Sequence, residues 1–297
     1  MIDLGVDLGP VRLSTPLVAA SGTFGSVVEF AEVADLRAYG ALTVKSVAPE
    51  PWPGNPPPRL APLEAGMLNA IGIQNPGIDR WVEEVAPELA RLDVPVWGSA
   101  VAHDPVGFAT VAEGFADAGL AAVEVNLSCP NLDGELFALD PAASAEVVAR
   151  VRSAVDLPVG VKLSPDASDV VAVAEAVVEA GADWLVLTNT ARGTAVDPRS
   201  GEPLVARGAG GISGTALRPI ALGCVRRVAE HLDVPIVGCG GVSTGRHVLE
   251  YLRAGARAVA LGTVHFEHPR AALRILRELR RELRRLGVAG IGDLVAS

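Results

Sequence analysis

The sequence predicts an α/β fold, specifically a single-domain (β/α)8 or TIM barrel that spans residues 1–297 and carries long loops at the carboxyl ends of its strands. Three observations lead to this prediction. Short apolar runs alternate with longer amphipathic segments, eight such pairs follow one another, and no stretch of different composition interrupts them. An open, doubly wound sheet would show the same alternation, so the pattern alone does not establish closure.

The expected strands are short and rich in β-branched residues. They cover residues 17–20, 41–45, 94–101, 121–126, 159–162, 184–188, 236–238 and 258–261. Amphipathic segments predict one helix after each strand, over residues 27–38, 78–92, 105–118, 142–155, 168–180, 216–231, 245–254 and 269–286. Many helices end in a glycine or an Asp-x-Pro turn just before the next strand, as at Asp156-Leu157-Pro158.

Composition excludes several classes of protein. With 25 basic and 35 acidic residues the net charge is −10, which argues against nucleic-acid binding. No apolar run approaches the roughly 18 residues that a membrane span needs. Three scattered cysteines and five histidines without ligand spacing indicate neither a disulfide framework nor a metal site. We therefore expect a cytoplasmic protein.

Two of the expected loops are unusually long for a compact domain. They cover residues 46–77 and 189–214, and both follow a strand at its carboxyl end. Loops of this length are usually lids or binding loops. In a barrel of this kind the active site lies at the same face, so polar residues at the strand ends are the candidates for function.

The strand ends carry a consistent set of polar residues and glycines. In chain order they are Ser21, Lys45, Ser46, Ser99, Asn126 with the loop 127–131, Lys162, Asn189, Thr190, Gly240, Gly241, Gly262 and Thr263. Glycine turns after the seventh and eighth strands expose backbone N–H groups and predict a phosphate site, although each pair alone could be only a tight turn.

Two lysines and four asparagines suggest what else the site binds. Lys45 and Lys162 close apolar strands, so each needs an anionic partner, which is either a ligand or a neighbouring carboxylate. Asn69, Asn126, Asn131 and Asn189 can donate and accept hydrogen bonds, as a planar ligand with carbonyl and N–H edges requires.

One cysteine is a candidate acid or base. Cys129 lies in the polar loop after the fourth strand, and its alternative role is that of a small buried apolar side chain, which we assign to Cys224. Cys239 lies beside a glycine pair with no polar residue accompanying it in the sequence.

Taken together, the motifs resemble class 1 dihydroorotate dehydrogenase. The resemblance rests on residues 20–25, Lys45-Ser46, Gly54-Asn55-Pro56-Pro57-Pro58-Arg59, and residues 66–77, and on Asn126-Leu127-Ser128-Cys129-Pro130-Asn131. It continues through residues 161–165, 210–214, 240–241, 262–263 and 293–295, and so covers essentially the whole chain.

This resemblance implies an FMN-dependent oxidation of (S)-dihydroorotate to orotate in de novo pyrimidine biosynthesis. Cys129 would be the general base that removes a proton from substrate C5, while a hydride leaves C6 for flavin N5. A cysteine at this position is typical of class 1, whereas the membrane-associated class 2 has serine. The residues implied to hold the substrate are Lys45, Asn69, Ile71, Gly72, Ile73, Asn126, Asn131, Asn189 and Thr190.

The flavin contacts implied by the resemblance partly overlap with this set. They are Ser21, Lys45, Ser46, Ser99, Asn126, Lys162, Leu187, Gly214, Gly240, Gly241, Gly262 and Thr263, with the last four implied to lie around the phosphate. Lys162 would lie near the isoalloxazine N1 and O2, where reduced flavin gathers negative charge.

Two motifs, at residues 54–59 and 69–73, are similar to the NAD-linked class 1B branch. That branch works with a partner subunit carrying FAD and a 2Fe–2S cluster, which implies a heterotetramer built on a homodimer core. The sequence departs from the class 1B pattern at Ser99, where asparagine is usual, and at Arg207-Gly208-Ala209, where an asparagine is expected before the glycines. Alternatives are a fumarate-linked class 1A homodimer, an FMN barrel acting on another pyrimidine, and a catalytically silent barrel.

Overall fold

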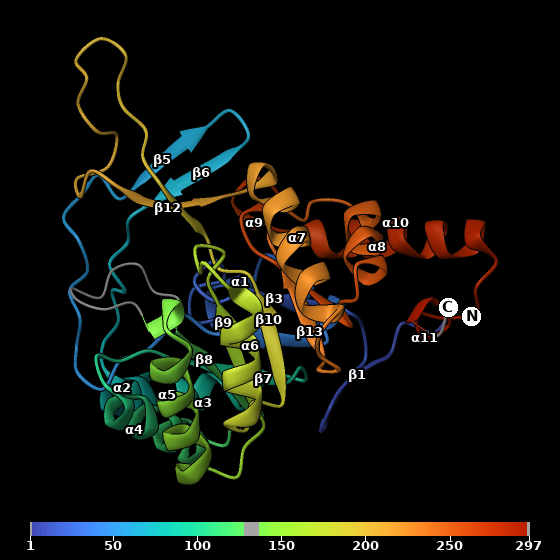
Figure 1. Ribbon diagram of the computed structural model, residues 1–297, viewed down its shortest axis with the longest axis horizontal. Coiled ribbons are helices and arrows are strands. Elements are labelled where there is room, and N and C mark those ends of the chain that lie inside the picture. The colour runs from blue at the N-terminus through green and yellow to red at the C-terminus, as the bar shows by residue number, and fades with distance from the viewer. Residues whose placement is uncertain (1, 128–136, 296–297) are drawn as a thin grey trace.

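The computed structural model describes residues 2–127 and 137–295, and in this part of the chain eight parallel strands form a closed barrel (Figure 1). The strands are β3 Leu17–Ala19, β4 Ala41–Thr43, β7 Val96–Ala100, β8 Ala122–Asn126, β9 Val159–Leu163, β10 Trp184–Leu187, β13 Ile236–Cys239 and β14 Ala258–Leu261. Strand β3 pairs with β4 on one side and with β14 on the other, which closes the ring. The predicted barrel is confirmed, and the open sheet is wrong.

Bulky side chains and glycines together determine how the barrel packs. Inside, the rings of Trp97 and Trp184 lie 4.9 Å apart, and both residues are fully buried. A Cβ atom at Gly160 would lie 2.3 Å from Nε1 of Trp184, so the glycine makes room for the indole. On the outside, Gly98 does the same for Phe115, since a Cβ there would lie 2.2 Å from its ring. Strand glycines therefore mark places of close packing.

Six longer helices surround this barrel (Figure 1). They are α4 Pro105–Asp117, α5 Pro141–Ala154, α6 Val170–Glu179, α7 Arg218–Ala229, α8 Gly245–Arg253 and α10 Ala271–Leu286, each within a predicted helical segment or one residue beyond it. Side chains cap several of their first turns; for example, Asp104 accepts a hydrogen bond from Gly107 N at 2.8 Å. The alternation predicted from the sequence is confirmed.

The first two predicted helices are shorter than expected, and the prediction of a single helix in each segment is wrong. Residues 27–38 form α1 Val28–Ala31 and the 3-10 turn η1 Leu36–Ala38, which Asp35 caps. Residues 78–92 divide into α2 Ile78–Glu84 and α3 Ala86–Leu89. Pro87 lies in the first turn of α3, where it has no N–H to continue the preceding helix. Short elements that were not expected are η2 Phe137–Leu139, η3 Thr215–Leu217, α9 Val264–Glu267 and α11 Gly292–Val295.

The two long loops contain strands of their own. The loop after β4 contributes β5 Leu60–Leu63 and β6 Gly66–Asn69, and the loop after β10 contributes β11 Ala191–Gly193 and β12 Gly210–Ser213. These four strands form one sheet in the order β11-β12-β6-β5, which we call the roof sheet. Figure 1 shows β5, β6 and β12 side by side, away from the end of the molecule where α4 and α5 lie.

The N-terminal part adds a small antiparallel hairpin, β1 Val6–Leu8 and β2 Val11–Leu13, ahead of the barrel. None of the helices in residues 2–127 and 137–295 combines the length and apolar character that crossing a bilayer requires.

Candidate active site

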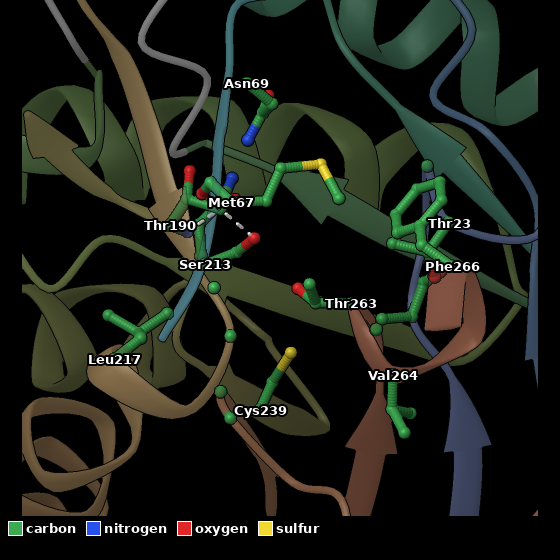
Figure 2. A pocket seen from close by; sticks show the side chains of 18 of the residues that line it. Thr23, Met67, Asn69, Thr190, Ser213, Leu217, Cys239, Thr263, Val264 and Phe266 are labelled. Carbon is green, nitrogen blue, oxygen red and sulfur yellow. Dashed lines mark hydrogen bonds between the residues drawn. The ribbon is translucent and has the colours of Figure 1, made fainter. Parts of the chain in front are cut away.

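A cavity of about 680 Å³ lies at the carboxyl ends of the barrel strands. The roof sheet supplies Met67, Asn69 and Ser213 to its wall, and the turn after β14 supplies Thr263 (Figure 2). Most of the residues predicted to bind substrate or cofactor line this one space: Ser21, Lys45, Ser46, Asn69, Ile71, Ile73, Asn126, Lys162, Asn189, Thr190, Gly214, Gly240, Gly241, Gly262 and Thr263. Residues from seven separate barrel strand ends thus meet in a single cavity.

Three predicted site residues do not line the cavity. Ser99 is fully buried behind it, and its hydroxyl lies 2.9 Å from the hydroxyl of Ser46, which does line the space. Leu187 is buried in β10. Gly72 has a φ of +73°, and a Cβ there would lie 2.6 Å from Asn55, so it supports the loop rather than the cavity surface. Cys129 and Asn131 lie outside the described residues.

A chain of polar side chains runs along one wall. Asn126 donates from Nδ2 to the Ser46 hydroxyl at 3.1 Å, and Asn189 donates from Nδ2 to Oδ1 of Asn126 at 3.3 Å. The Asn189 Oδ1 atom accepts from Thr190 N at 2.8 Å. Each amide is therefore oriented by a neighbour, which prepares this wall for a ligand with both donor and acceptor edges.

The cavity floor contains a buried pair of opposite charges. Nζ of Lys162 lies 4.0 Å from Oε1 of Glu124, and their side chains are only 6% and 3% exposed. The same ammonium lies 3.5 Å from the Ser21 hydroxyl. Burial raises the pKa of the Glu124 carboxyl, against the opposing effects of Lys162 and of a hydrogen bond with Ser21. The neighbouring carboxylate considered for the lysines is therefore present at Lys162.

The glycine turns that follow β13 and β14 form another part of the cavity lining. Among the described residues, no acceptor is found for the N–H groups of Gly240, Gly241, Gly262 and Thr263. Gly241 has a φ of +66°, and a Cβ there would lie 2.7 Å from Arg218 Cβ. Only glycine fits this turn, and the four donors that face no protein acceptor suit an anionic group.

The roof sheet is held by very close backbone contacts. A Cβ at Gly66 would lie 1.8 Å from the Ser213 carbonyl oxygen, and one at Gly210 would lie 2.1 Å from the Asn69 carbonyl oxygen. Asn69 donates from Nδ2 to Gly211 O at 2.9 Å. These glycines let β6 and β12 approach each other directly over the cavity.

One buried histidine, His265, lies behind the turn after β14 together with two hydrogen-bonding neighbours. The His265 ring is buried, with Nε2 2.9 Å from the Tyr39 hydroxyl and Nδ1 3.3 Å from Oγ1 of Thr23, which lines the cavity. Burial lowers the pKa of His265 to about 3. The histidine is therefore neutral and links the loop after β3 to the barrel wall.

Known proteins resemble this chain over nearly all of its length. A family model described as dihydroorotate dehydrogenase matches residues 4–283. The chain belongs to the dihydroorotate dehydrogenase family. The predicted family, and with it the prediction of an oxidoreductase, is confirmed.

Two relatives show which branch it resembles. The chain is 42% identical to a protein of Pelobacter propionicus over 99% of this chain and 98% of the relative, and 41% identical to one of Geobacillus kaustophilus over 98% and 94%. Both are named dihydroorotate dehydrogenase B (NAD(+)), catalytic subunit. The predicted similarity to the class 1B branch of the dihydroorotate dehydrogenases is confirmed.

Three residues at or beside this candidate site were not predicted from the sequence. Glu124 was read as part of an apolar run, although a lone carboxylate in a buried strand was itself a signal. Cys239 lines the cavity, and the charge of Lys162 acts on its thiol, so the absence of a polar neighbour in the sequence was misleading. His265 was set aside with the other histidines, and only the fold brings it to Tyr39 and Thr23.

Proposed function

We propose that this chain is the catalytic subunit of an FMN-dependent dihydroorotate dehydrogenase, which oxidises (S)-dihydroorotate to orotate in de novo pyrimidine biosynthesis. Residues 1–297 work as one FMN-binding barrel. The observation that carries the proposal is a single cavity that combines an amide-lined wall, a buried lysine and a turn rich in free N–H donors, in a member of this family.

The residues present fit FMN. Its phosphate is an anion, and Gly240, Gly241, Gly262 and Thr263 offer N–H groups that have no acceptor among the described residues. A Cβ at Gly262 would have its nearest neighbours at 3.7 Å, so its absence leaves open space on the cavity side. Lys162 offers a positive charge for the N1 and O2 edge of the ring. The volume of about 680 Å³ is in the range of cofactor and ligand pockets.

The substrate binds at the amide-lined wall. Asn69, Asn126 and Asn189 present amides from β6, β8 and the turn after β10, and Asn131 completes the set. Lys45 pairs with the substrate carboxylate, while Ile71, Ile73 and Thr190 close the space around the ring. The roof sheet over this wall keeps bulk water away from the reacting carbons.

Proton transfer is assigned to Cys129. Its thiolate takes the proton from substrate C5, and the orienting amides hold that carbon at the thiol. FMN, when bound, supplies the hydride acceptor at N5. Cys239 is not suited to the role of base, because burial raises the pKa of its thiol.

We infer the electron acceptor from the names of the relatives. The names of these relatives describe a catalytic subunit and NAD(+), so we propose a separate electron-transfer subunit with FAD and a 2Fe–2S cluster. Two copies of each subunit form a heterotetramer on a homodimer of this chain. In the competing assignment, a homodimer without the partner passes electrons to fumarate.

Anaerobic titration of the purified protein tests the proposal. It is expected to be yellow and to bleach with dihydroorotate but not with dihydrouracil, which lacks the carboxylate that Lys45 binds. A protein that stays colourless after incubation with FMN would contradict the assignment. Turnover with NAD only after the partner is added supports class 1B, and turnover with fumarate alone supports the competing one.

Replacement of Cys129, the proposed base, distinguishes a role in ligand binding from a role in proton transfer. Cys129→Ser is expected to keep FMN and orotate affinity but to slow flavin reduction at neutral pH by about 100-fold, within the range for general bases. A Cys239→Ser variant is the matched control and should bleach at the wild-type rate. Equal rates for Cys129→Ser and wild type would remove Cys129 from the mechanism.

A further inference from the structure

The buried charge pair on the cavity floor has an unusual geometry. Glu124 and Lys162 lie on the neighbouring strands β8 and β9, where Glu124 is in register with Gly160 and Lys162 with Asn126. The two side chains therefore start one layer apart, and the lysine lies nearer the cavity. Their closest atoms are 4.0 Å apart, which is an ion-pair distance but too long for a hydrogen bond.

The Glu124 carboxyl lacks part of the hydrogen bonding that so deeply buried a group requires. Oε1 of Glu124 has no hydrogen-bond partner among the described residues. The indoles of Trp97 and Trp184 lie inside the same barrel, but Nε1 of each has no hydrogen-bond partner among the described residues, so neither donates to this carboxyl. A buried carboxylate without full hydrogen bonding is costly, so protonation of this group is much easier than in water.

Few titratable groups of the described residues act on the Glu124–Lys162 pair. Among the described residues, the titratable groups that act on Glu124 and on its neighbour Cys239 are Lys162 and these two residues themselves, and Ser21 is the polar neighbour shared by the pair. Protonation of Glu124 changes the net charge of the pair from zero to plus one. It does so directly below the cavity, where solvent does not screen the difference.

We propose that Glu124 is a positioning residue that holds Lys162 at the cavity floor and, through its own protonation, sets how much of the lysine's positive charge the flavin meets. The inference rests on the proposed binding of FMN in this cavity. Reduced flavin carries more negative charge than oxidised flavin, so an uncompensated Lys162 favours the reduced state. With Glu124 ionised the preference is weaker, and with Glu124 protonated it is stronger.

The test measures the midpoint potential of the bound flavin between pH 6 and 9 in wild type and Glu124→Gln. Glutamine keeps the shape of the side chain but not its charge. At the high-pH end the variant is expected to favour reduced over oxidised FMN about tenfold more than wild type does, which is about 30 mV for a two-electron couple. The two curves should converge as the pH falls, because wild-type Glu124 then becomes neutral as well.

Further variants distinguish this role from a merely structural one. Glu124→Asp keeps the charge but withdraws it from Lys162, so its curve should lie between the other two. Glu230→Gln, which removes an exposed carboxylate paired with Arg226, is the control and should follow wild type.

Specific results would overturn the proposal. Parallel curves for wild type and Glu124→Gln over the whole range would do so, as would equal weakening of oxidised and reduced FMN binding without a change in potential. If Glu124→Gln does not retain FMN, an Asp variant that coincides with wild type is equally decisive. A wild-type protein that binds no FMN contradicts the proposed function instead, so the two failures can be distinguished.

Discussion

The floor and the roof of the cavity are built on different principles. The floor comes from strand ends of the barrel, where ladder register sets the height of each side chain and polar groups are matched across strands, as with Glu124 and Lys162. The roof comes from two loops whose strands meet through glycines, so that backbone contacts backbone. The structure of the floor therefore depends on which side chains the barrel strands carry. The close approach of the roof strands depends on glycines, which have no side chain.

Removal of the floor lysine should have the largest effect on stability. Lys162→Met leaves Glu124 buried without a counter-charge, and we expect the free energy of unfolding to fall by about 3 kcal/mol. Urea unfolding followed by tryptophan fluorescence measures this. The double variant Lys162→Met/Glu124→Gln should recover a large part of the loss.

The other lysine of the chain provides the matched control. Lys45 is partly exposed at the cavity wall, so Lys45→Met should cost less than half as much. Equal losses of unfolding free energy in the two lysine variants would show that the buried Glu124–Lys162 pair adds nothing to stability beyond what a partly exposed lysine adds.

A roof glycine should affect ligand binding more than stability. In Gly66→Ala the new methyl would meet the Ser213 carbonyl, so β6 and β12 have to separate. We expect orotate affinity, measured by quenching of flavin fluorescence, to fall more than tenfold, while the urea midpoint changes less than in Lys162→Met. This corresponds to more than about 1.4 kcal/mol of binding free energy.

Gly201→Ala is the control for backbone strain. Gly201 also has a positive φ, of +76°, but no atom of the described residues lies within 4 Å of an added Cβ. Its substitution should leave orotate affinity unchanged. A similar loss in both variants would mean that strain, and not the close approach of the strands, is responsible.

The buried histidine predicts an effect on stability that is smaller than that of Lys162→Met and depends on pH. The pKa of His265 is lowered from 6.5 to about 3 in the folded protein, so between these values the unfolded chain binds the proton and the folded chain does not. Its stabilising contribution is present above pH 6.5 and is lost as the pH falls, by about 2 kcal/mol at pH 5.

Urea unfolding at pH 7 and pH 5 tests this sign. His265→Phe should lose about 2 kcal/mol less than wild type between the two pH values, because phenylalanine takes up no proton. Tyr39→Phe keeps the histidine buried and should retain the wild-type dependence. The same slope in wild type and His265→Phe would contradict the assignment.

The sequence predicted the floor much better than the roof. Each barrel strand is an apolar run bounded by turn residues, so its position and its polar end can be recognised locally. Thus Lys45, Asn126 and Lys162 were placed at the cavity from the sequence alone. Cys129 and Asn131 lie outside the described residues, and their roles remain predictions.

The roof strands escaped prediction because their residues form no strand pattern. Gly66-Met67-Leu68-Asn69 and Gly210-Gly211-Ile212-Ser213 are short and contain glycines, which are normally read as loops. They become strands only because each finds the other across more than a hundred residues of chain. The Glu124–Lys162 pair was missed for a related reason, since it depends on the register between two strands.

Closure of the barrel through β3 has a consequence for how the molecule is made. This strand of three residues, Leu17–Ala19, has β4 close behind it in the chain, but its second neighbour β14 follows only at Ala258–Leu261. A chain that emerges from the ribosome N-terminus first must expose one edge of β3 until about 240 residues later. The glycine turn after β14 forms at the same late stage. Binding of the proposed cofactor at this turn therefore has to wait until the barrel has closed.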